Sequence, residues 1–217
     1  MTFGQVFEPG DVPSGRTVSA RVGQTAIPLQ VDAKARHAFG SLRHAILTLS
    51  MSSVPAGQDV VVELVSAAED SGDPAVPVAV EEVLATAFDA SVTLTVGGTA
   101  YELSARPLLQ GTTAMKWLSG RLVSEWVVWA PVAAAGAQHP HLAARFSVRA
   151  YAGVKRVRVA VAVENDWAFE PAPRNFVYDA SIRVGAAETY AKAELNHYHH
   201  ARWRKGCWWG EGAASRP

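Results

Sequence analysis

Alternation of apolar and polar residues with a period of two is the sequence feature that most constrains this chain. The clearest example is the segment Val154–Glu164, in which every second residue from position 157 to position 163 is valine. Because successive side chains of a β-strand point to opposite faces, this pattern indicates a strand with one buried face. Similar runs recur along the chain, and we count about ten. The sequence therefore predicts an all-β protein, either a barrel or a sandwich.

The strongest hairpin signal lies between residues 91 and 105. Ser91–Val96 and Thr99–Ala105 flank the pair Gly97-Gly98. Two glycines can adopt the positive φ angles that a two-residue primed turn requires. We therefore expect these two segments to pair as antiparallel neighbours.

One short helix is expected after residue 79. Its apolar residues fall on one helical face, namely Val80, Val83, Leu84, Ala87 and Phe88. Glu81 and Glu82 lie in the first turn, where the helix dipole favours negative charge. We expect this helix to cover one end of a barrel or one face of a sheet. The segment Pro107–Thr113 is interpreted as a connector.

The 217 residues are enough for one large domain or two small ones. The main prediction is a single β-rich domain over residues 1–205, followed by a C-terminal tail over residues 206–217. The alternative is two lobes, with a barrel over residues 1–112 and a second sheet over residues 113–205. The connector after Pro107 marks the boundary in that case.

Charge and cysteine content exclude several classes of protein. The 20 basic residues balance the 20 acidic ones, which argues against a dedicated nucleic-acid binder or a protein of anionic membrane surfaces. The single cysteine, Cys207, excludes an internal disulfide framework and a cysteine-only zinc site. The first residues lack the basic and apolar regions of a signal peptide. We therefore expect synthesis in the cytoplasm, with a virus particle as an alternative destination.

The densest group of candidate binding residues lies between positions 198 and 209. It combines aromatic and basic side chains: Tyr198, Arg202, Trp203, Arg204, Trp208 and Trp209. Aromatic rings pack against the C–H surfaces of sugars, and tryptophan, tyrosine and arginine are enriched at protein interfaces. This segment is therefore the predicted binding surface. In the alternative interpretation the tryptophans simply fold back onto the barrel.

The sequence contains two histidine pairs that could form a site. His197 and His199 would share one face of a continuous strand, which is how a strand presents two imidazoles to a metal. No third ligand follows at a fitting spacing, so surface histidines are the preferred interpretation and no cofactor is predicted. The pair His139 and His141 lies in a Gly/Ala-rich segment and is interpreted as solvated.

Two stretches carry a resemblance to a known family. They comprise Thr2–Phe7, Gly10–Pro13, Pro28–Ala35 and Gly40–Ala45 in the first half, and Glu164–Trp167, Pro173–Phe176 and His197–Trp203 in the second. These motifs resemble the N-terminal RIFT-barrel domain of exo-rhamnogalacturonan lyase-like proteins. Phe39 departs from the family pattern, because an aspartate is expected at the start of that turn.

The resemblance implies a fold more than an activity. Enzymes of that family have further domains after this one, and similar barrels are encoded among phage structural genes. A non-catalytic binding or assembly module is therefore expected, such as a phage tail, baseplate or decoration protein. Its partners would be further copies of itself or other structural proteins, without nucleic acid or membrane. The alternative is a carbohydrate-binding module or a lyase-related protein that acts on pectic sugars. In a lyase, the segment between positions 198 and 209 would supply a general base and an arginine that binds the sugar carboxylate.

Overall fold

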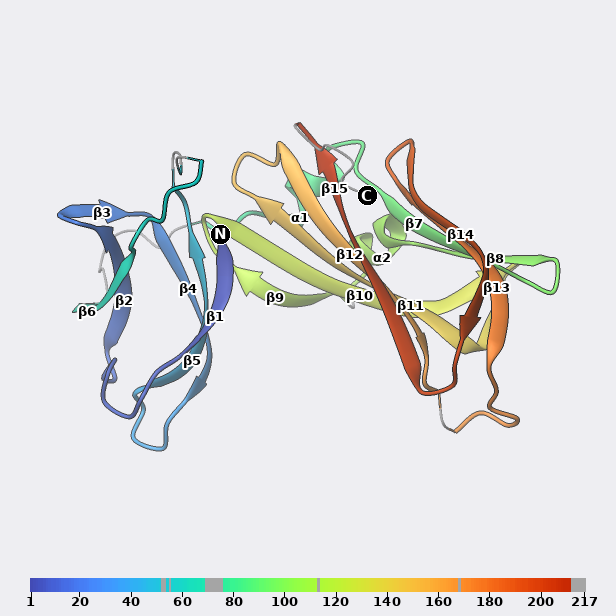
Figure 1. The fold of residues 1–217 in the computed structure, drawn as a ribbon, viewed down its shortest axis with the longest axis horizontal. Helices are drawn as coiled ribbons and strands as arrows, with labels where there is room; N and C mark the ends of the chain where they lie inside the picture. The colour runs from blue at the N-terminus through green and yellow to red at the C-terminus, as the bar shows by residue number, and fades with distance from the viewer. Residues whose placement is uncertain (52–53, 55, 69–75, 113, 168, 212–217) are drawn as a thin grey trace. The chain divides into compact units, whose positions relative to one another are not determined.

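The computed structural model describes residues 1–51, 54, 56–68, 76–112, 114–167 and 169–211 (Figure 1). These ranges contain fifteen strands and two short helices. The all-β prediction is confirmed, with more strands than the sequence indicated. No helix within the described ranges has the length and apolar character needed to cross a bilayer.

The chain forms two compact units that are interleaved in sequence. One unit comprises Met1–Val78 with Leu118–Ser124, and the other comprises Ala79–Trp117 with Glu125–Pro217. The chain thus passes between the units after residues 78, 117 and 124. The two-lobe alternative has a single division after residue 112, whereas residues 79–112 belong with the C-terminal unit.

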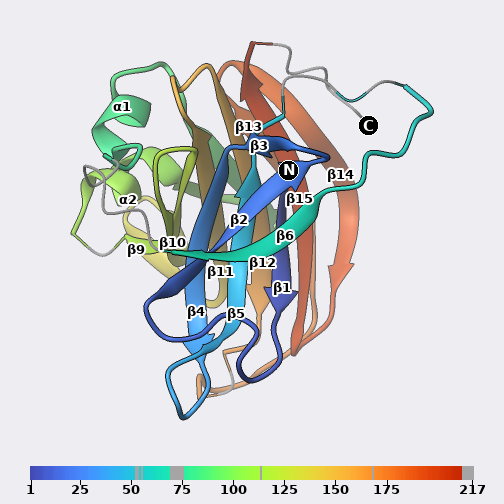
Figure 2. The same ribbon diagram turned by 90° about the vertical axis from the view of Figure 1, so that its left-hand side faces the viewer.

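The first unit is a small sandwich of two antiparallel sheets. One sheet has the order β1-β5-β4 and the other β3-β2-β6 (Figures 1 and 2). The strands are β1 (Thr2–Val6), β2 (Arg16–Val22), β3 (Thr25–Ile27), β4 (Leu29–Arg36), β5 (Leu42–Leu49) and β6 (Glu63–Ala68). β3 and β4 are separate strands rather than one continuous strand. Pro28 separates β3 from β4, because proline lacks the N–H that a continuous ladder requires.

The core of the first unit lies between these two sheets. Val18 of β2 packs with Leu42, Ala45 and Leu47 of β5, and all four are buried. Ala45 and Leu47 share one face of β5, and this face is buried in the core. Across the β1–β5 pair, the hydroxyls of Thr2 and Thr48 lie 3.0 Å apart.

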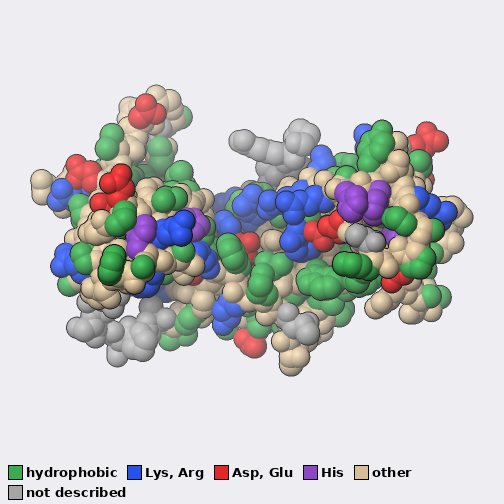
Figure 3. All heavy atoms as spheres, turned by 90° about the horizontal axis from the view of Figure 1, so that it is seen from below, with side chains coloured by type: hydrophobic (Ala, Val, Ile, Leu, Met, Phe, Trp, Pro, Cys, Tyr) green, Lys and Arg blue, Asp and Glu red, His purple; other side chains and the backbone are tan. Residues whose placement is uncertain are grey.

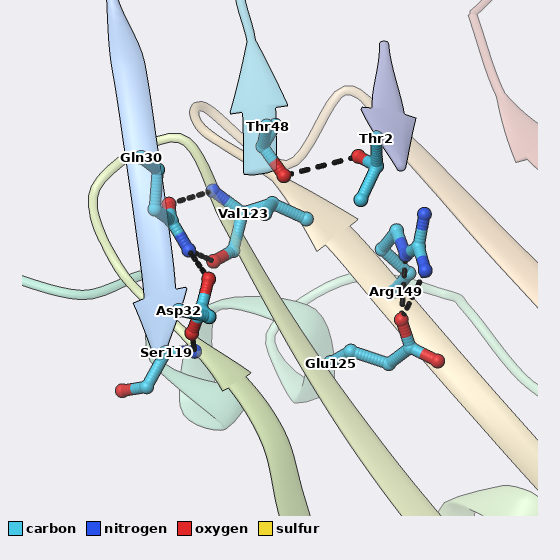
Figure 4. Close-up of polar contacts among 8 residues, drawn as sticks. All are labelled: Thr2, Gln30, Asp32, Thr48, Ser119, Val123, Glu125 and Arg149. Atoms are coloured by element: carbon cyan, nitrogen blue, oxygen red, sulfur yellow. Dashed lines mark hydrogen bonds and ion pairs between the residues drawn. The ribbon is translucent and has the colours of Figure 1, made fainter. Parts of the chain in front are cut away.

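The segment Leu118–Ser124 is held on β4 by two polar side chains (Figure 4). The buried amide of Gln30 accepts hydrogen bonds from the backbone N–H of Leu122 and Val123 and donates one to the Val123 carbonyl. The carboxylate of Asp32 accepts from the backbone N–H of Ser119 at 2.8 Å. Gly120 is required beneath this amide, because a Cβ there would overlap the Gln30 side chain.

The second unit is built on one nine-stranded antiparallel sheet. The order is β14-β13-β7-β8-β10-β11-β12-β15, with β9 paired to β10. Its elements are α1 (Val80–Leu84), β7 (Ala90–Val96), β8 (Thr99–Ser104), α2 (Ala105–Gln110), β9 (Met115–Ser119), β10 (Val123–Ala134), β11 (Ala137–Tyr151), β12 (Arg156–Asn165), β13 (Phe176–Val184), β14 (Ala187–His197) and β15 (Ala201–Gly210). The end strands β14 and β15 are joined by a short turn, so the sheet curls back on itself and nearly closes (Figure 1).

The interior of this sheet contains the predicted valine face of β12. Val157, Val159, Val161 and Val163 are all completely buried. Each lies opposite a β11 residue of the same face, for example Val161 opposite Phe146. The hairpin prediction is also confirmed, because β7 and β8 flank Gly97 and Gly98, and both glycines have positive φ.

Two helices replace the single predicted one. α1 ends at Leu84, earlier than the apolar pattern indicated, although Val83 and Phe88 are buried as expected. α2 occupies part of the segment interpreted as a connector. Pro107 lies in its first turn, where the missing N–H costs nothing. The Arg106 guanidinium donates to carbonyl groups just beyond α1, including that of Phe88 at 2.9 Å.

The predicted tail begins too early. β15 continues to Gly210 and pairs with β12 along its whole length, from Ala201 opposite Asn165 to Gly210 opposite Arg156. Residues 206–210 are therefore part of the sheet, because the ladder of β12 offers them partners. Residues 212–217 lie outside the described residues.

Candidate functional site

β15 presents two different sets of side chains because its residues alternate between the faces of the sheet. Trp203, Cys207 and Trp209 lie opposite buried valines of β12, on the inner face. Arg202, Arg204 and Trp208 lie on the outer face. The predicted binding segment is therefore divided between the core and the surface.

The inner side chains of β15 span the seam between β14 and β15, the two strands that end the sheet without pairing to each other. The Trp203 ring lies 5.5 Å from that of Tyr190, and Lys205 Nζ lies 4.6 Å from the same Tyr190 ring. Cys207 Sγ lies 3.3 Å from Thr189 Oγ1. These contacts close the sheet through side chains rather than through a backbone ladder.

Trp209 also packs against residues of its own unit. Its ring meets Phe88 edge to face at 5.9 Å. A Cβ on Gly185 would lie only 3.0 Å from the indole nitrogen of Trp209. For Trp203 and Trp209 the contacts therefore match the alternative interpretation, in which the tryptophans pack against their own domain.

A chain of hydrogen bonds crosses the interior at the base of this seam. Trp203 Nε1 donates to Tyr178 Oη at 2.8 Å, and Tyr178 Oη lies 2.7 Å from His197 Nδ1. His197 Nε2 lies 2.9 Å from the carbonyl of Ala201, so it donates and Nδ1 accepts from the tyrosine. Burial raises the pKa of Tyr178 and lowers that of His197, so both groups stay neutral.

The structure does not support the two-histidine metal site. β14 ends at His197, and residues 198–200 form a turn with φ of 60° at His200, so His199 does not continue the strand. Both ring nitrogens of His197 already have protein partners. In the parts of the chain that are described, no three His, Cys, Asp or Glu residues gather as a metal site would require. Tyr198 lies in the same turn and is 59% exposed.

The outer face of the second unit carries a groove of about 360 Å³. It runs over β9, β10, β11, β12 and β15. Its lining residues are Met115, Trp117, Glu125, Val127, Arg145, Ser147, Ala160, Ala162, Arg202 and Arg204. Small side chains at Ser147, Ala160 and Ala162 form the floor, so a ligand can approach the sheet closely. Figure 3 shows Lys and Arg side chains gathered in a band beside hydrophobic surface.

Two ion pairs hold the charged residues along this face. The Arg149 guanidinium contacts Glu125 Oε2 at 2.6 Å (Figure 4), and Arg145 Nη2 contacts Glu164 Oε1 at 2.6 Å. Glu125 and Arg149 are both largely buried, with side-chain exposures of 9% and 15%. Each glutamate therefore has a cation of its own.

Arg202 and Arg204 are exposed, and neither has a carboxylate within 4 Å among the residues that the structure describes. Glu164 lies opposite Arg202 in the β12–β15 register but directs its carboxylate to Arg145. The groove is thus lined by three arginines and one glutamate, and two of the arginines remain available for a ligand.

Trp208 lies on the same outer face as these arginines. Its ring stacks on Tyr151, with centroids 5.9 Å apart, and the Arg156 guanidinium lies 5.3 Å from its centroid. The side chain stays 39% exposed. Of the predicted binding residues, Arg202, Arg204 and Trp208 are therefore the ones displayed together on the outer face.

Sequence reasoning missed the partners that other strands contribute to this groove. Arg145, Glu125 and Trp117 were not singled out, although Trp117 lines the groove and is 41% exposed. The signal for Arg145 was the alternation of β11, in which its neighbours Ala144 and Phe146 are completely buried. A polar residue between two core positions points outward, which the sequence alone shows.

The histidine pair His139 and His141 was wrongly interpreted as solvated. Both side chains are buried within β11, where they pack against Phe176. His139 Nδ1 accepts hydrogen bonds from the backbone N–H groups of His141 and Leu142. Burial, with smaller contributions from His141 and Arg174, lowers the pKa of His139 to about 4.

Comparison with known proteins found no relative of this chain. No family model, no curated protein and no solved structure matches the chain. The resemblance to the lyase-like RIFT barrels therefore stays a prediction from the sequence.

Proposed function

We propose that this protein is a non-catalytic binding and assembly module that engages an anionic partner through the groove on its outer face. The observation that carries the proposal is the pair Arg202 and Arg204. Both line a groove with a floor of small side chains, and neither is neutralised by a carboxylate of the described chain.

Arginine is well suited to such a role. Its guanidinium is always charged and forms paired hydrogen bonds with a carboxylate. Both arginines stand on a paired strand, so their backbone does not have to be ordered when the partner binds. Carboxylates of a protein partner are the ligand that this arrangement fits.

The groove favours binding over catalysis. An arginine stays protonated and is a poor proton donor or acceptor. Glu125, the acidic lining residue, is engaged by Arg149. A general acid or base has to exchange a proton near neutral pH, and these groups are not poised to do so.

Assembly with other structural proteins is the setting that the sequence analysis favours, as in a phage tail, baseplate or decoration protein. The groove offers such a partner a docking place of positive charge. Pairing with a second copy of the chain is the simplest form of the same arrangement.

A second candidate is binding of an acidic oligosaccharide such as a pectic uronate. The observation that favours it is Trp117, whose partly exposed ring lines the same groove as the arginines. An aromatic ring can pack on the apolar face of a sugar while an arginine binds its carboxylate.

Calorimetric titration of the full chain with poly-glutamate and with polygalacturonate tests both candidates. We expect poly-glutamate to bind more weakly as salt is raised, and the double variant Arg202→Ala/Arg204→Ala to bind at least about tenfold more weakly, since a charge-assisted hydrogen bond contributes about 1.5–3 kcal/mol.

Arg183→Ala is the matched control, because Arg183 is exposed on β13, outside the groove lining. Binding of polygalacturonate alone would transfer the proposal to the second candidate. If neither polymer binds, or if Arg183→Ala loses as much affinity as the double variant, the groove is not an anion-binding site.

A further inference from the structure

We infer that the partner is an extended polypeptide segment that lies along β15 and carries acidic side chains two residues apart, followed by an apolar side chain. This inference rests on the proposed function and adds the spacing and conformation of the ligand. The outer face of β15 carries a single row of side chains. Residues 202, 204, 206 and 208 follow one another on this face, at about 7 Å per step.

The row has a distinct order of chemistry. Arg202 and Arg204 carry charge, Gly206 has no side chain, and Trp208 has a partly exposed aromatic ring. An extended peptide repeats its side chains at the same spacing as a strand. Acidic residues at its first and third positions would face the two arginines, and an apolar residue at its seventh would face Trp208.

Glu164 explains why two acidic positions are expected rather than three. Its carboxylate occupies Arg145 at 2.6 Å, so the third arginine of the groove is already neutralised by the chain itself. Glu164 also lies opposite Arg202 in the ladder. A third carboxylate placed towards Arg145 would meet this glutamate and be repelled.

The floor beside the row leaves space for a backbone. Ala160 lies opposite Gly206, and Ala162 lies opposite Arg204, in the β12–β15 register. Neither alanine projects far from the sheet, and a Cβ added to Gly206 would meet no atom within 4 Å. A peptide main chain can therefore approach between the charged side chains, which a bulky helix could not do as closely.

Fluorescence anisotropy with labelled seven-residue peptides, on the full chain at low ionic strength, tests the inference. The first probe has Asp at positions 1 and 3, Leu at position 7 and Ser or Thr elsewhere. The second has the same composition with the two Asp residues adjacent. We expect the alternating probe to bind at least tenfold more tightly than the adjacent one.

Variants of the protein give independent readouts. Arg202→Ala and Arg204→Ala should each weaken the alternating probe, whereas the control Arg183→Ala should not. Glu164→Gln should release Arg145 and increase the affinity of a probe that carries a third Asp. The charge reversal Arg202→Glu/Arg204→Glu should abolish binding of the Asp probe and confer binding of a probe with Lys at positions 1 and 3, which a misfolded variant could not do.

The outcomes separate this inference from the proposed function. If poly-glutamate binds but the two Asp probes bind equally, the groove is an anion site and the inference fails. Tighter binding of a helical probe with Asp four residues apart, or of polygalacturonate alone, would also overturn it. If no polyanion binds at all, the proposed function and the inference fail together.

Discussion

At the scale of single residues, the chain of hydrogen bonds through Tyr178 fixes the inner side of the β14–β15 turn. One hydroxyl group serves both Trp203 and His197, and no other partner of the two ring nitrogens involved is seen within the described residues. A polar group that is left buried without a partner is costly. The stability of this end of the sheet therefore depends on a single oxygen atom.

Replacing Tyr178 with phenylalanine should reveal this dependence. Tyr178→Phe keeps the ring but removes the oxygen, so we expect a loss of about 1–3 kcal/mol in the free energy of unfolding. Urea denaturation followed by tryptophan fluorescence measures it. Tyr198→Phe is the control, because Tyr198 is exposed, and equal stability of the two variants would contradict the role of the hydroxyl.

The buried pair Glu125 and Arg149 makes a second prediction at this scale. Glu125→Ala leaves the Arg149 guanidinium largely buried without its counter-charge and should cost about 3–5 kcal/mol. The double variant Glu125→Leu/Arg149→Leu removes both charges and should lose less than the single variant. Denaturation midpoints of the three proteins test this, and a purely additive loss would refute it.

At the scale of secondary-structure elements, the end of β15 is set by Gly210. Its φ is 99°, and a Cβ there would overlap the carbonyl of Lys155. Gly210→Ala should therefore destabilise the protein by at least about 1 kcal/mol. Gly206→Ala, on the same strand and with open space around it, should be neutral or slightly stabilising. Thermal denaturation of both variants checks this, and similar losses would show that strand propensity, not backbone geometry, dominates.

Elements whose signal is local were predictable from the sequence. The valines of β12 and the Gly97-Gly98 hairpin depend on neighbours in the chain, and both predictions are confirmed. α2 was missed because the segment Pro107–Thr113 was interpreted as a connector, although proline is tolerated in a first helical turn. The end of β15 was missed because its partner, β12, lies about 45 residues away in sequence, and only pairing shows that Gly206 continues the strand.

The candidate site was less predictable than the fold for the same reason. Arg202 and Arg204 could be selected from their aromatic-rich neighbourhood, but Arg145 and Trp117 come from other strands. No local pattern reveals that Glu164 pairs with Arg145 rather than with Arg202. The register between strands that are distant in the sequence decides which arginine pairs with Glu164. This register cannot be derived from a single sequence.

At the scale of the whole molecule, buried histidines make stability depend on pH. The folded pKa of His139 is about 4, below its ordinary value of 6.5, so the unfolded chain binds more protons between these two values. We expect His139 to leave the free energy of unfolding unchanged above pH 6.5. As the pH decreases to 4, the free energy of unfolding should fall by about 3 kcal/mol, at 1.36 kcal/mol per pKa unit. The lowered pKa of His197 acts in the same direction.

Urea denaturation between pH 7 and pH 4 measures this loss. His139→Leu should have a smaller pH dependence than the natural chain, even if its stability at pH 7 is lower. The exposed His200 provides the control His200→Asn, since asparagine tolerates the positive φ at that position. If His139→Leu has the same pH dependence as the natural chain, His139 is not the source of the loss of stability at low pH.

Side chains of β15 alternate between the two faces of the sheet, and this couples the stability of β15 to that of β14, the other end strand. Its inner side chains hold β14 through Tyr190 and Thr189, while its outer side chains would hold the partner. A partner that binds only the ordered strand stabilises it by about 2.7 kcal/mol at a concentration of 100 times Kd. Because an ordered β15 also keeps the seam shut, amide protons of β14 should exchange with solvent more slowly when the groove is occupied, although the partner never touches that strand.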